Sequence, residues 1–571
     1  MADYDVVVIG SGAGGLTAAL ALAQAGQRVL VLEQHYVPGG WCHSFTLEGY
    51  RFSPGVHYIG GLEPGGSMRA IYEGLGVSGD LAFCQLNPDG FDHIFLGEKR
   101  FDWPQGADHL AERLKTHFPH EKAGIDGFLR DVEQMPVELN RLSRLKRPSQ
   151  FIKVPRIAPT VTRFGWRSGA DLINYHVQDP QLRGILGGQS GDHGLPPSMV
   201  SAAVHAGLVH HYLNGGYYPL GGGFAIPRAM VRGLKRAGGE IRLSTAVTEI
   251  VVRNGRAVGV RLADGQEITA NAIISNADPE VTFGKLIGRQ KLSARLRRKL
   301  DRVTYSVSAL SLFLAVDMDL KAAGLDSGNY WFYAHEDVDA LYKLGMSDAI
   351  IQMEDIPMMF LTVTTLKDPS KMHNGHHTLE VFTFVGYDAF TRWANSTYEQ
   401  RPDDYKAFKQ QLTDRMLAAL DKRVPGLREH VVFSSLGTPL TNQYYLNATK
   451  GNLYGIAKSR FQVGPLAFPI RSEIEGLYLC GASTISHGVA GATQSGLMAA
   501  QAILGVRRQE LLRQNGPELA VYPSEDVSQW PAKLRRRIER GQRTGGAVPQ
   551  LDEADELALY QGEDLRVEIG D

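Results

Sequence analysis

The first 33 residues hold the pattern that most constrains the fold of this chain. The segment Asp5–Ile9 contains a continuous β-branched run, as expected of a parallel strand that is buried on both faces. A glycine-rich loop, Gly10–Gly15, follows it, and then come an apolar helix at Leu16–Ala25 and a second buried strand at Val29–Leu32. Glu33 ends that strand, 18 residues after the last glycine of the loop. This order of elements predicts a dinucleotide-binding unit rather than a purely structural turn.

The residues of this unit have separate physical roles. Gly10 permits a tight turn, Gly12 lets the backbone approach a pyrophosphate, and Gly15 lets the helix pack closely against the first strand. Glu33 is placed to accept hydrogen bonds from the ribose hydroxyls of an adenosine.

A second glycine pair follows the acid in Pro38-Gly39-Gly40. Alone, this tripeptide is typical of an ordinary turn, and the dinucleotide could still be NAD. So soon after a dinucleotide unit, the pair suits a backbone loop that covers a flavin dinucleotide, and FAD is the expected cofactor. Gly221-Gly222-Gly223 lacks the strand, helix and acid that a second dinucleotide site for NADPH would need.

Two later segments extend the predicted cofactor domain. Between Glu240 and Ser275, short β-rich runs alternate with Asn254-Gly255 and Asp264-Gly265, which are strong hairpin signals and predict a meander. A last strand at Gly476–Cys480 enters a glycine-containing loop and then a small-residue helix at about Val489–Leu504, an arrangement that suits phosphate contact through backbone N–H groups. The candidate cofactor-binding residues are Gly10, Gly12, Gly14, Gly15, Glu33, Gly39, Gly40, Val247, Gly481 and Ala482.

The fold class predicted from these elements is α/β and discontinuous, because 571 residues exceed what one hydrophobic core usually supports. Residues 1–74, 215–289 and 471–505 are expected to form a Rossmann-type domain of the two-dinucleotide-binding kind. Residues 75–214 and 290–470, richer in aromatic and long apolar side chains, are expected to form an inserted α+β substrate domain. Residues 506–571 are strongly charged and are interpreted as a surface tail, partly disordered.

Composition excludes several classes of function. Lys and Arg number 60 against 61 for Asp and Glu, so there is no global field to attract nucleic acid. Three distant cysteines form no C-x-x-C pair, and three nearby histidines, His205, His210 and His211, lack the i, i+4 spacing of a helical metal site. We therefore expect no metal site and no disulfide scaffold. No feature of the sequence specifies an oligomeric state.

The segment 141–167 carries an unusual local charge. It contains eight basic residues and no acid. Apolar side chains, including Phe151, Ile152, Phe164 and Trp166, are interleaved with them, a composition typical of a segment that lies at an anionic membrane surface. The apolar runs are too short for a signal peptide or a membrane span. The expected location is cytoplasmic, with peripheral membrane association; a simple solvated surface is the alternative. The basic residues are Arg141, Arg144, Lys146, Arg147, Lys153, Arg156, Arg163 and Arg167.

Three parts of the chain resemble a known family. They are Asp5–Leu16 with Glu33–His35 and Pro38–Gly40, then Gly55–Gly60, and then His211–Gly222. Together they resemble the retinol saturases, which sit within the larger phytoene desaturase and carotene isomerase superfamily. The likeness covers most of residues 1–505, and the second and third parts are the more specific to saturase-like members. The loop Gly481-Ala482-Ser483-Thr484 departs from them, since saturases usually carry Asp there, and looks more like a bacterial phytoene desaturase.

The resemblance implies a split architecture similar to that of monoamine oxidases, bound FAD, and hydride exchange with a hydrophobic polyene such as a carotenoid or retinoid. Saturation is the expected reaction, ahead of desaturation and cis–trans isomerisation. Saturation needs a proton donor, and His57, Tyr58 and His487 are the candidates, although each equally suits a structural hydrogen-bonding role. An enzyme that oxidises amines or porphyrinogens on the same scaffold, and a flavin-binding protein without turnover, are the alternatives.

Overall fold

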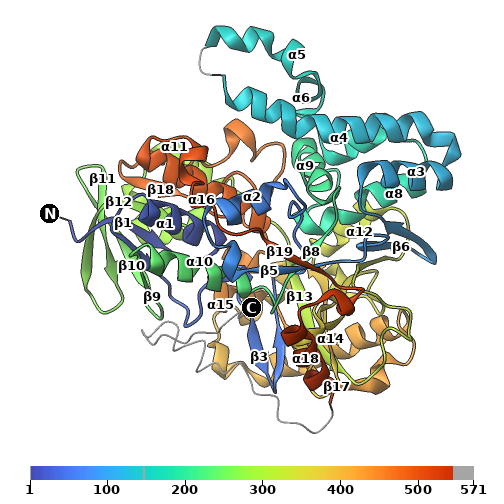
Figure 1. Cartoon of the computed structure of the whole chain (residues 1–571). Coiled ribbons are helices and arrows are strands. Elements are labelled where there is room, and N and C mark those ends of the chain that lie inside the picture. Colours follow the sequence, from blue (N-terminus) through green and yellow to red (C-terminus); the bar gives the residue numbers. More distant parts are fainter. Residues whose placement is uncertain (1, 146–147, 544–571) are drawn as a thin grey trace.

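The computed structural model of the chain describes residues 2–145 and 148–543, and its elements are built around two large β-sheets (Figure 1). The first sheet has the strand order β10-β11-β12-β1-β2-β9, and β18 pairs with β12. Its strands are β1 (Tyr4–Ile9), β2 (Val29–Leu32), β9 (Glu240–Arg242), β10 (Val247–Arg253), β11 (Arg256–Leu262), β12 (Glu267–Ser275) and β18 (Leu477–Leu479).

The β-branched run in β1 is explained by burial on both faces of this sheet. Val6 and Val8 face a core shared with α1 (Ala13–Gln24), α10 (Ala225–Arg236) and α16 (Gly488–Leu504). Val7 and Ile9 point to the other face, where residues of β10, β11 and the segment after β12 cover them. Because successive side chains of a strand alternate between faces, both sets must be apolar.

Strand β12 joins the meander to the parallel part of the sheet. Its first residues pair with β11 in an antiparallel ladder, and its last residues pair in parallel with β1 and β18. The hairpin predicted at Asn254-Gly255 connects β10 to β11, and both of its residues have positive φ. The predicted start of the meander is wrong, because β9 pairs in parallel with β2.

The second sheet carries the largest core. Its strand order is β17-β13-β16-β15-β14-β6-β7, antiparallel except for the β14–β6 pair. Aromatic side chains dominate its packing, among them Trp331, Phe360 and Phe384, all almost fully buried. The strands are β6 (Asp92–Leu96), β7 (Lys99–Trp103), β13 (Ser308–Val316), β14 (Asn329–Tyr333), β15 (Met358–Val363), β16 (His377–Val385) and β17 (Val431–Gly437).

A group of helices extends beyond this sheet at the top of Figure 1. Helix α4 is the longest described and packs on α3, α6, α7 and α9, while α5 and α6 project from the body. None of the described helices is long and apolar enough to cross a bilayer. The helices here are α3 (Ala107–His117), α4 (Lys122–Ser143), α5 (Val154–Ile157), α6 (Pro159–Phe164), α7 (Gly169–His176), α8 (Pro180–Gly187) and α9 (Ala202–Tyr212).

The remaining elements complete the body. A hairpin of β3 (Phe45–Leu47) and β4 (Tyr50–Phe52) contacts β16. The other helices are α2 (Ser67–Gly74), α11 (Ala294–Asp301), α12 (Val338–Gly345), α13 (Thr364–Lys367), α14 (Asp403–Asp421) and α15 (Pro439–Leu446).

The prediction of a surface tail after residue 505 is wrong for residues 506–543. They form α17 (Arg508–Leu511), β19 (Ala520–Pro523) and α18 (Ala532–Gly541), and β19 pairs in parallel with β5 (Ala82–Gln85), which also pairs with β8 (Tyr217–Pro219). Leu519, Trp530 and Ile538 are buried against the body. A few apolar residues among many charged ones therefore hold residues 506–543 against the body. Residues 544–571 lie outside the described part of the chain.

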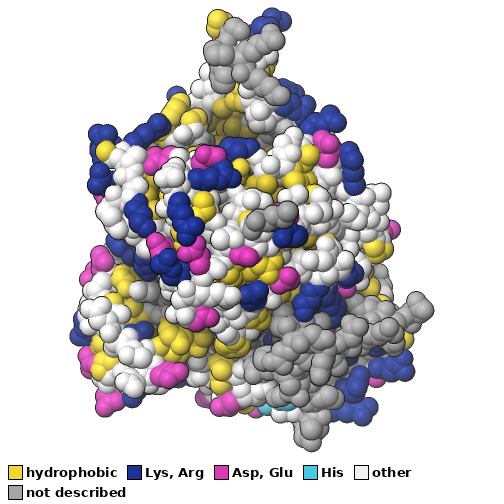
Figure 2. Space-filling model, turned by 90° about the vertical axis from the view of Figure 1, so that its left-hand side faces the viewer, with side chains coloured by type: hydrophobic (Ala, Val, Ile, Leu, Met, Phe, Trp, Pro, Cys, Tyr) yellow, Lys and Arg dark blue, Asp and Glu magenta, His cyan; other side chains and the backbone are white. Residues whose placement is uncertain are grey.

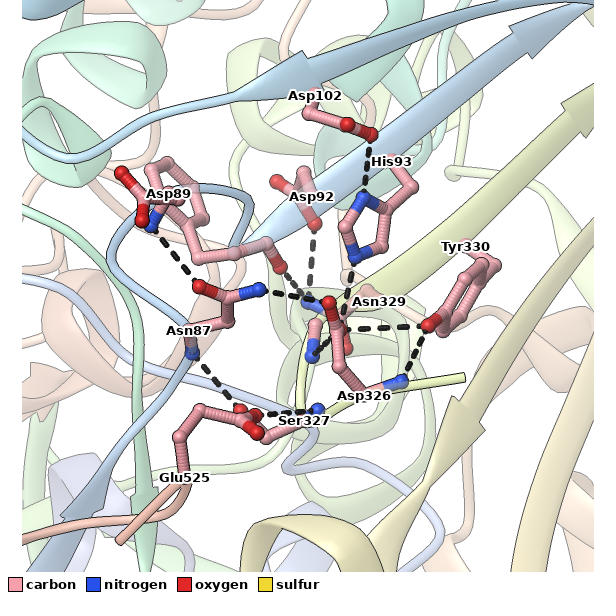
Figure 3. A network of polar contacts seen from close by, with 12 residues as sticks. Asn87, Asp89, Asp92, His93, Asp102, Asp326, Ser327, Asn329, Tyr330 and Glu525 are labelled. Carbon is pink, nitrogen blue, oxygen red and sulfur yellow. Dashed lines mark hydrogen bonds and ion pairs between the residues drawn. The ribbon is translucent and has the colours of Figure 1, made fainter. Parts of the chain in front are cut away.

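A polar network ties the second sheet to the C-terminal segment (Figure 3). His93 Nδ1 lies 2.6 Å from Asp102 Oδ1, and its Nε2 lies 2.8 Å from Asp326 Oδ1. Burial alone would lower the pKa of His93, but the two carboxylates outweigh burial and raise it. Beside them, the Ser327 N–H donates to Glu525 at 2.9 Å. The C-terminal segment is thus joined to the sheet by polar contacts as well as by burial.

Candidate functional site

A cavity of about 290 Å³ lies between the two sheets. Ile9, Glu33 and Gly481 line it at or just after the carboxyl ends of β1, β2 and β18. Its opposite wall comes from the second sheet, through Ser311 on β13 and Phe382 on β16. Ligands of open α/β sheets bind outside the carboxyl ends of the strands, so this cavity is the candidate cofactor site.

The glycine loop brings backbone to the cavity wall. Gly10 adopts a φ of 87°, which turns the chain sharply after β1. Gly12 is the N-cap of α1, and a Cβ there would lie 2.6 Å from Asn276 Nδ2. Both glycines line the cavity, so the N–H groups that begin α1 open toward it, as anion binding requires.

Gly14 and Gly15 have a different role from Gly10 and Gly12, because neither lines the cavity. A Cβ on Gly14 would come within 2.9 Å of both Ala492 O and Gly481 N, and one on Gly15 would collide with Gly10 O. These two glycines allow α1 to approach β1 and α16 closely. Their contribution to a cofactor site is indirect.

Glu33 is held rigidly at the end of β2. One oxygen, Oε2, accepts hydrogen bonds from the Ser11 N–H (2.8 Å) and hydroxyl (2.6 Å), and Oε1 accepts one from the His35 N–H at 2.9 Å. The Ser11 hydroxyl also accepts a hydrogen bond from the Gly39 N–H at 3.1 Å. A carboxylate has about four lone-pair sites, so Glu33, which already accepts three hydrogen bonds, retains capacity for one more, from a ribose hydroxyl of an adenosine.

The other candidate cofactor residues also reach this cavity. Gly39 and Gly40 line it from the covering loop, Val247 lines it from the start of β10, and Gly481 and Ala482 line it from the loop before α16. Eight of the ten predicted cofactor residues thus share one cavity, and only Gly14 and Gly15 stand behind its wall.

Asn276 is a site residue that the sequence interpretation missed. It follows β12 directly, and its Oδ1 accepts a hydrogen bond from the Gly15 N–H (3.1 Å) and a weaker one from Cys480 Sγ (3.4 Å). It therefore fastens the glycine loop to the end of β18. The available signal was its position at the carboxyl end of a buried strand, where ligand sites occur.

His57 is the predicted catalytic residue that lines the cavity. Its ring packs beside Phe360 and Phe382, with centroid distances of 5.4 and 5.3 Å. His57 Nδ1 lies 3.1 Å from Glu380 Oε2, and the Ser53 N–H donates to Glu380 Oε1 at 2.6 Å. Glu380 on β16, another residue that the sequence interpretation missed, thus lies within ion-pair distance of an imidazole at the cavity, but the described residues form no hydrogen bond between these two atoms.

Tyr58 does not line the cavity and points into a buried carboxyl pair. Its Oη lies 3.0 Å from Asp92 Oδ2 and 2.5 Å from Asp192 Oδ2. Burial, together with the nearby Asp92, raises the pKa of Asp192 well above its usual range. Because a hydroxyl has only one proton, Tyr58 cannot donate to both carboxylates. A protonated Asp192 satisfies both contacts.

Asp92 is fixed within this group by β14. Its Oδ1 accepts hydrogen bonds from Asn329 Nδ2 (2.9 Å) and Trp331 Nε1 (3.2 Å), and Figure 3 shows Asp92 facing Asn329. Lys367 joins this group to His57, donating to Asn329 Oδ1 (2.5 Å) and to the His57 carbonyl (2.7 Å). Burial lowers the pKa of Lys367 to about 7. A chain of buried polar contacts therefore begins beside the cavity.

His487 occupies the N-cap position of α16, without a capping hydrogen bond from its side chain, and does not line the cavity. Its ring lies 5.3 Å from the ring of Tyr454, which does line the cavity. Burial lowers the pKa of His487 to about 3, which keeps the imidazole neutral. Of the three predicted catalytic residues, only His57 reaches the cavity itself. Among the described residues, no cluster of His, Cys, Asp and Glu is suited to a metal ion.

The comparisons with known proteins address the cofactor directly. The model of the flavin containing amine oxidoreductase family matches residues 13–504. The chain belongs to this family. It is therefore a flavin-dependent oxidoreductase, and the glycine loops, Glu33 and the cavity that joins the two sheets fit a bound flavin.

Curated relatives and solved structures agree with this assignment. All-trans-retinol 13,14-reductase of Danio rerio is 32% identical over 528 residues, covering 88% of this chain and 86% of the relative. The chloroplastic prolycopene isomerase of Daucus carota is 30% identical and covers 88% and 80%. Cyclohexylamine oxidase of Brevibacterium oxydans has the same fold, with 17% identity, a TM-score of 0.57 and coverage of 90% and 100%. The predicted fold class and the resemblance to retinol saturases and carotene isomerases are confirmed.

We predict that Gly12→Leu abolishes flavin retention without unfolding the protein. The new side chain would fill the space between the start of α1, Asn276 and the cavity. The ratio of flavin to protein absorption after purification measures retention, and circular dichroism measures folding. Gly207→Leu, at a glycine of α9 where a Cβ would contact nothing within 4 Å, is the matched control and should keep its flavin. Full flavin occupancy in Gly12→Leu would refute the assignment of the loop.

Proposed function

We propose that this protein binds FAD and uses it for redox chemistry on a conjugated polyisoprenoid, with saturation as the reaction. The observation that carries the proposal is His57, an imidazole 3.1 Å from the Glu380 carboxylate at the part of the cavity that faces the second sheet. Identity near 30% over most of the chain to enzymes named for retinol and prolycopene supports the substrate class.

The adenosine-binding features favour FAD over a smaller flavin. Glu33 and Val247 line the part of the cavity beside the first sheet, while His57, Ser311 and Phe382 line the part beside the second. A dinucleotide, with an adenosine and an isoalloxazine at opposite ends, matches a cavity with these two parts. The glycines between them suit its pyrophosphate.

The cofactor and the protein would contribute different parts of the reaction. A bound flavin supplies hydride exchange with carbon. In saturation, His57 is the residue at the cavity that would give a proton to the second carbon. Phe360 and Phe382 hold the ring in place and exclude water from it. Glu380 places a carboxylate oxygen 3.1 Å from Nδ1 of this ring.

Amine oxidation is the second candidate, because it gives the family its name. The cyclohexylamine oxidase is only 17% identical to this chain, against about 30% for the polyene enzymes. Amine turnover would release hydrogen peroxide, which provides a direct discriminating measurement.

We predict that the holoenzyme reduces a retinoid or carotenoid when its flavin is kept reduced. Incubation with all-trans-retinol, carotenes and their cis isomers under dithionite should give a product two mass units heavier, with blue-shifted absorption because conjugation is shortened. A lighter, red-shifted product with an electron acceptor would show desaturation instead, and unchanged mass with altered geometry would show isomerisation. Peroxide from amines, with no polyene product, would contradict the proposal.

We also propose that the protein binds membranes through the segment 141–167. In the described part of this segment, Ile152 is 84% exposed and Trp166 is 66% exposed. Arg156 and Lys153 are exposed nearby, and Figure 2 shows basic and hydrophobic side chains close together at the upper end of one face. Exposed apolar side chains among cations suit an anionic bilayer, which also dissolves the polyene substrate.

Part of the predicted pattern differs in the structure. Phe164 was expected among the membrane-facing apolar residues but is fully buried, with the guanidinium groups of Arg163 and Arg167 both 5.9 Å from its ring. The periodicity of α6 turns this side chain into the helical core instead. Lys146 and Arg147 lie outside the described residues.

We predict that the double variant Ile152→Asp, Trp166→Asp binds anionic liposomes about tenfold more weakly than the wild type, because two apolar side chains no longer insert. Co-sedimentation measures binding, and rising salt should weaken it in the wild type. The double variant Leu47→Asp, Val432→Asp, which changes exposed apolar residues of β3 and β17 at the opposite end of the molecule in Figure 1, is the control and should bind normally. Salt-independent binding to neutral liposomes, or no binding, would count against this surface.

A further inference from the structure

Three exposed apolar side chains lie on chain segments that run side by side. Antiparallel bridges join residues 166–169 to residues 199–202, and these in turn to residues 458–461. One large apolar residue of each segment faces solvent. Single exposed apolar residues are normal on a protein surface, but several on neighbouring segments indicate an interaction site. They are Trp166 (66% exposed), Met199 (39%) and Phe461 (65%).

The loop 458–468 extends this apolar surface toward α11. Leu466, on the same loop, is 42% exposed. Lys299 of α11 donates a hydrogen bond to the Ala467 carbonyl at 2.7 Å, and its ammonium lies 4.4 Å from the centre of the Phe468 ring. The loop therefore packs against α11, which lies toward the same upper end of the molecule as α5 and α6 (Figure 1).

Arginines surround these apolar side chains. The Arg460 guanidinium lies 4.9 Å from the centre of the Phe461 ring, and both Arg460 and Arg167 interact electrostatically with Asp171. On α11 and at its C-cap, four arginines are exposed, and none of them forms an ion pair within the described part of the chain. The surface thus combines exposed apolar groups with unpaired cations. The four are Arg295, Arg297, Arg298 and Arg302.

This composition matches an anionic bilayer. Aromatic side chains such as Trp166 and Phe461 are favoured at the boundary between lipid headgroups and acyl chains, and arginines are attracted to anionic headgroups. Trp166 also belongs to the segment 141–167, for which we propose membrane binding above. The surface of the loop 458–468 and α11 is therefore continuous with that segment.

We propose that Met199, the loop 458–468 and the arginines of α11 form a second membrane-binding surface, joined to the segment 141–167 through Trp166. The inference rests on the proposed membrane binding and deepens it. Parts of the chain far apart in sequence contact one bilayer together, so the protein is held in a fixed orientation rather than tethered by a single segment. Because residues 453–455 line the cavity, this orientation holds the bilayer close to the part of the chain that forms the cavity wall.

The test is a nitroxide spin label on Phe461→Cys in the oxidised holoenzyme. Cys42, Cys84 and Cys480 are all buried, so the label attaches to the introduced cysteine. With phosphatidylcholine vesicles that contain phosphatidylserine, we expect the label to gain access to oxygen and to lose access to a water-soluble nickel chelate, as an inserted group does. A label on Val432→Cys, at an exposed residue of β17, is the matched control and should not change.

The arginines of α11 are tested by co-sedimentation with the same vesicles. The double variant Arg295→Gln, Arg302→Gln should bind about tenfold more weakly than the wild type at low salt, since each cation near an anionic surface adds to the attraction. Its melting temperature should not change, because both side chains are exposed and unpaired. The double variant Arg535→Gln, Arg536→Gln removes the same charge from α18 at the lower end of the molecule in Figure 1 and should bind normally.

Four results would contradict the proposals, each in a different way. An unchanged label at Phe461→Cys, with a label at Ile152→Cys that inserts, would remove the second surface and leave the first. Loss of access to both oxygen and the nickel chelate would assign Phe461 to contact with another protein. Equal binding by the α11 and α18 double variants would exclude α11 from the surface. Labels unchanged at both Phe461→Cys and Ile152→Cys would contradict the membrane proposal as a whole.

Discussion

The glycine loop can present its backbone to a cofactor only because three chain segments meet there with almost no side chain between them. A Cβ on Gly14 would press on both Gly481 and Ala492, so α1, the last strand and α16 converge at that point. Asn276 fastens the contact by accepting a hydrogen bond from the Gly15 N–H. The cavity depends on this close approach, since each of the three segments contributes residues to its wall.

The second sheet supplies the side chains that face the cofactor site from the opposite wall of the cavity. It brings Phe382 to the cavity and, two residues earlier on β16, Glu380 to His57, although the glycine loop lies more than 300 residues earlier in the sequence. Near this wall lie Asp192 and Lys367; burial raises the pKa of the former well above its usual range and lowers that of the latter to about 7. Side chains with shifted pKa values are concentrated at functional sites. Their presence beside this cavity is therefore expected if the cavity is a functional site.

The cofactor side of the site could be predicted from local sequence, whereas the substrate side could not. Spacing and strand context place Gly10, Gly12 and Glu33, because the dinucleotide unit is a local structure of about 30 residues. Glu380 reaches His57 only through tertiary pairing, and no local pattern links residues so far apart. The segment after residue 505 was wrongly predicted to be a surface tail for a related reason. Charged residues dominate its composition, but a few buried side chains such as Trp530 determine its packing.

The central claim is that a polyene reaches a flavin held between the two sheets. It is tested most directly by mixing chemically reduced holoenzyme with all-trans-retinol in the absence of oxygen and of any other oxidant. The account predicts that flavin absorption returns at the same rate as the polyene absorption is lost, with one equivalent of each changed. A flavin that stays reduced while the retinol spectrum remains unaltered, although the retinoid is bound, would contradict it.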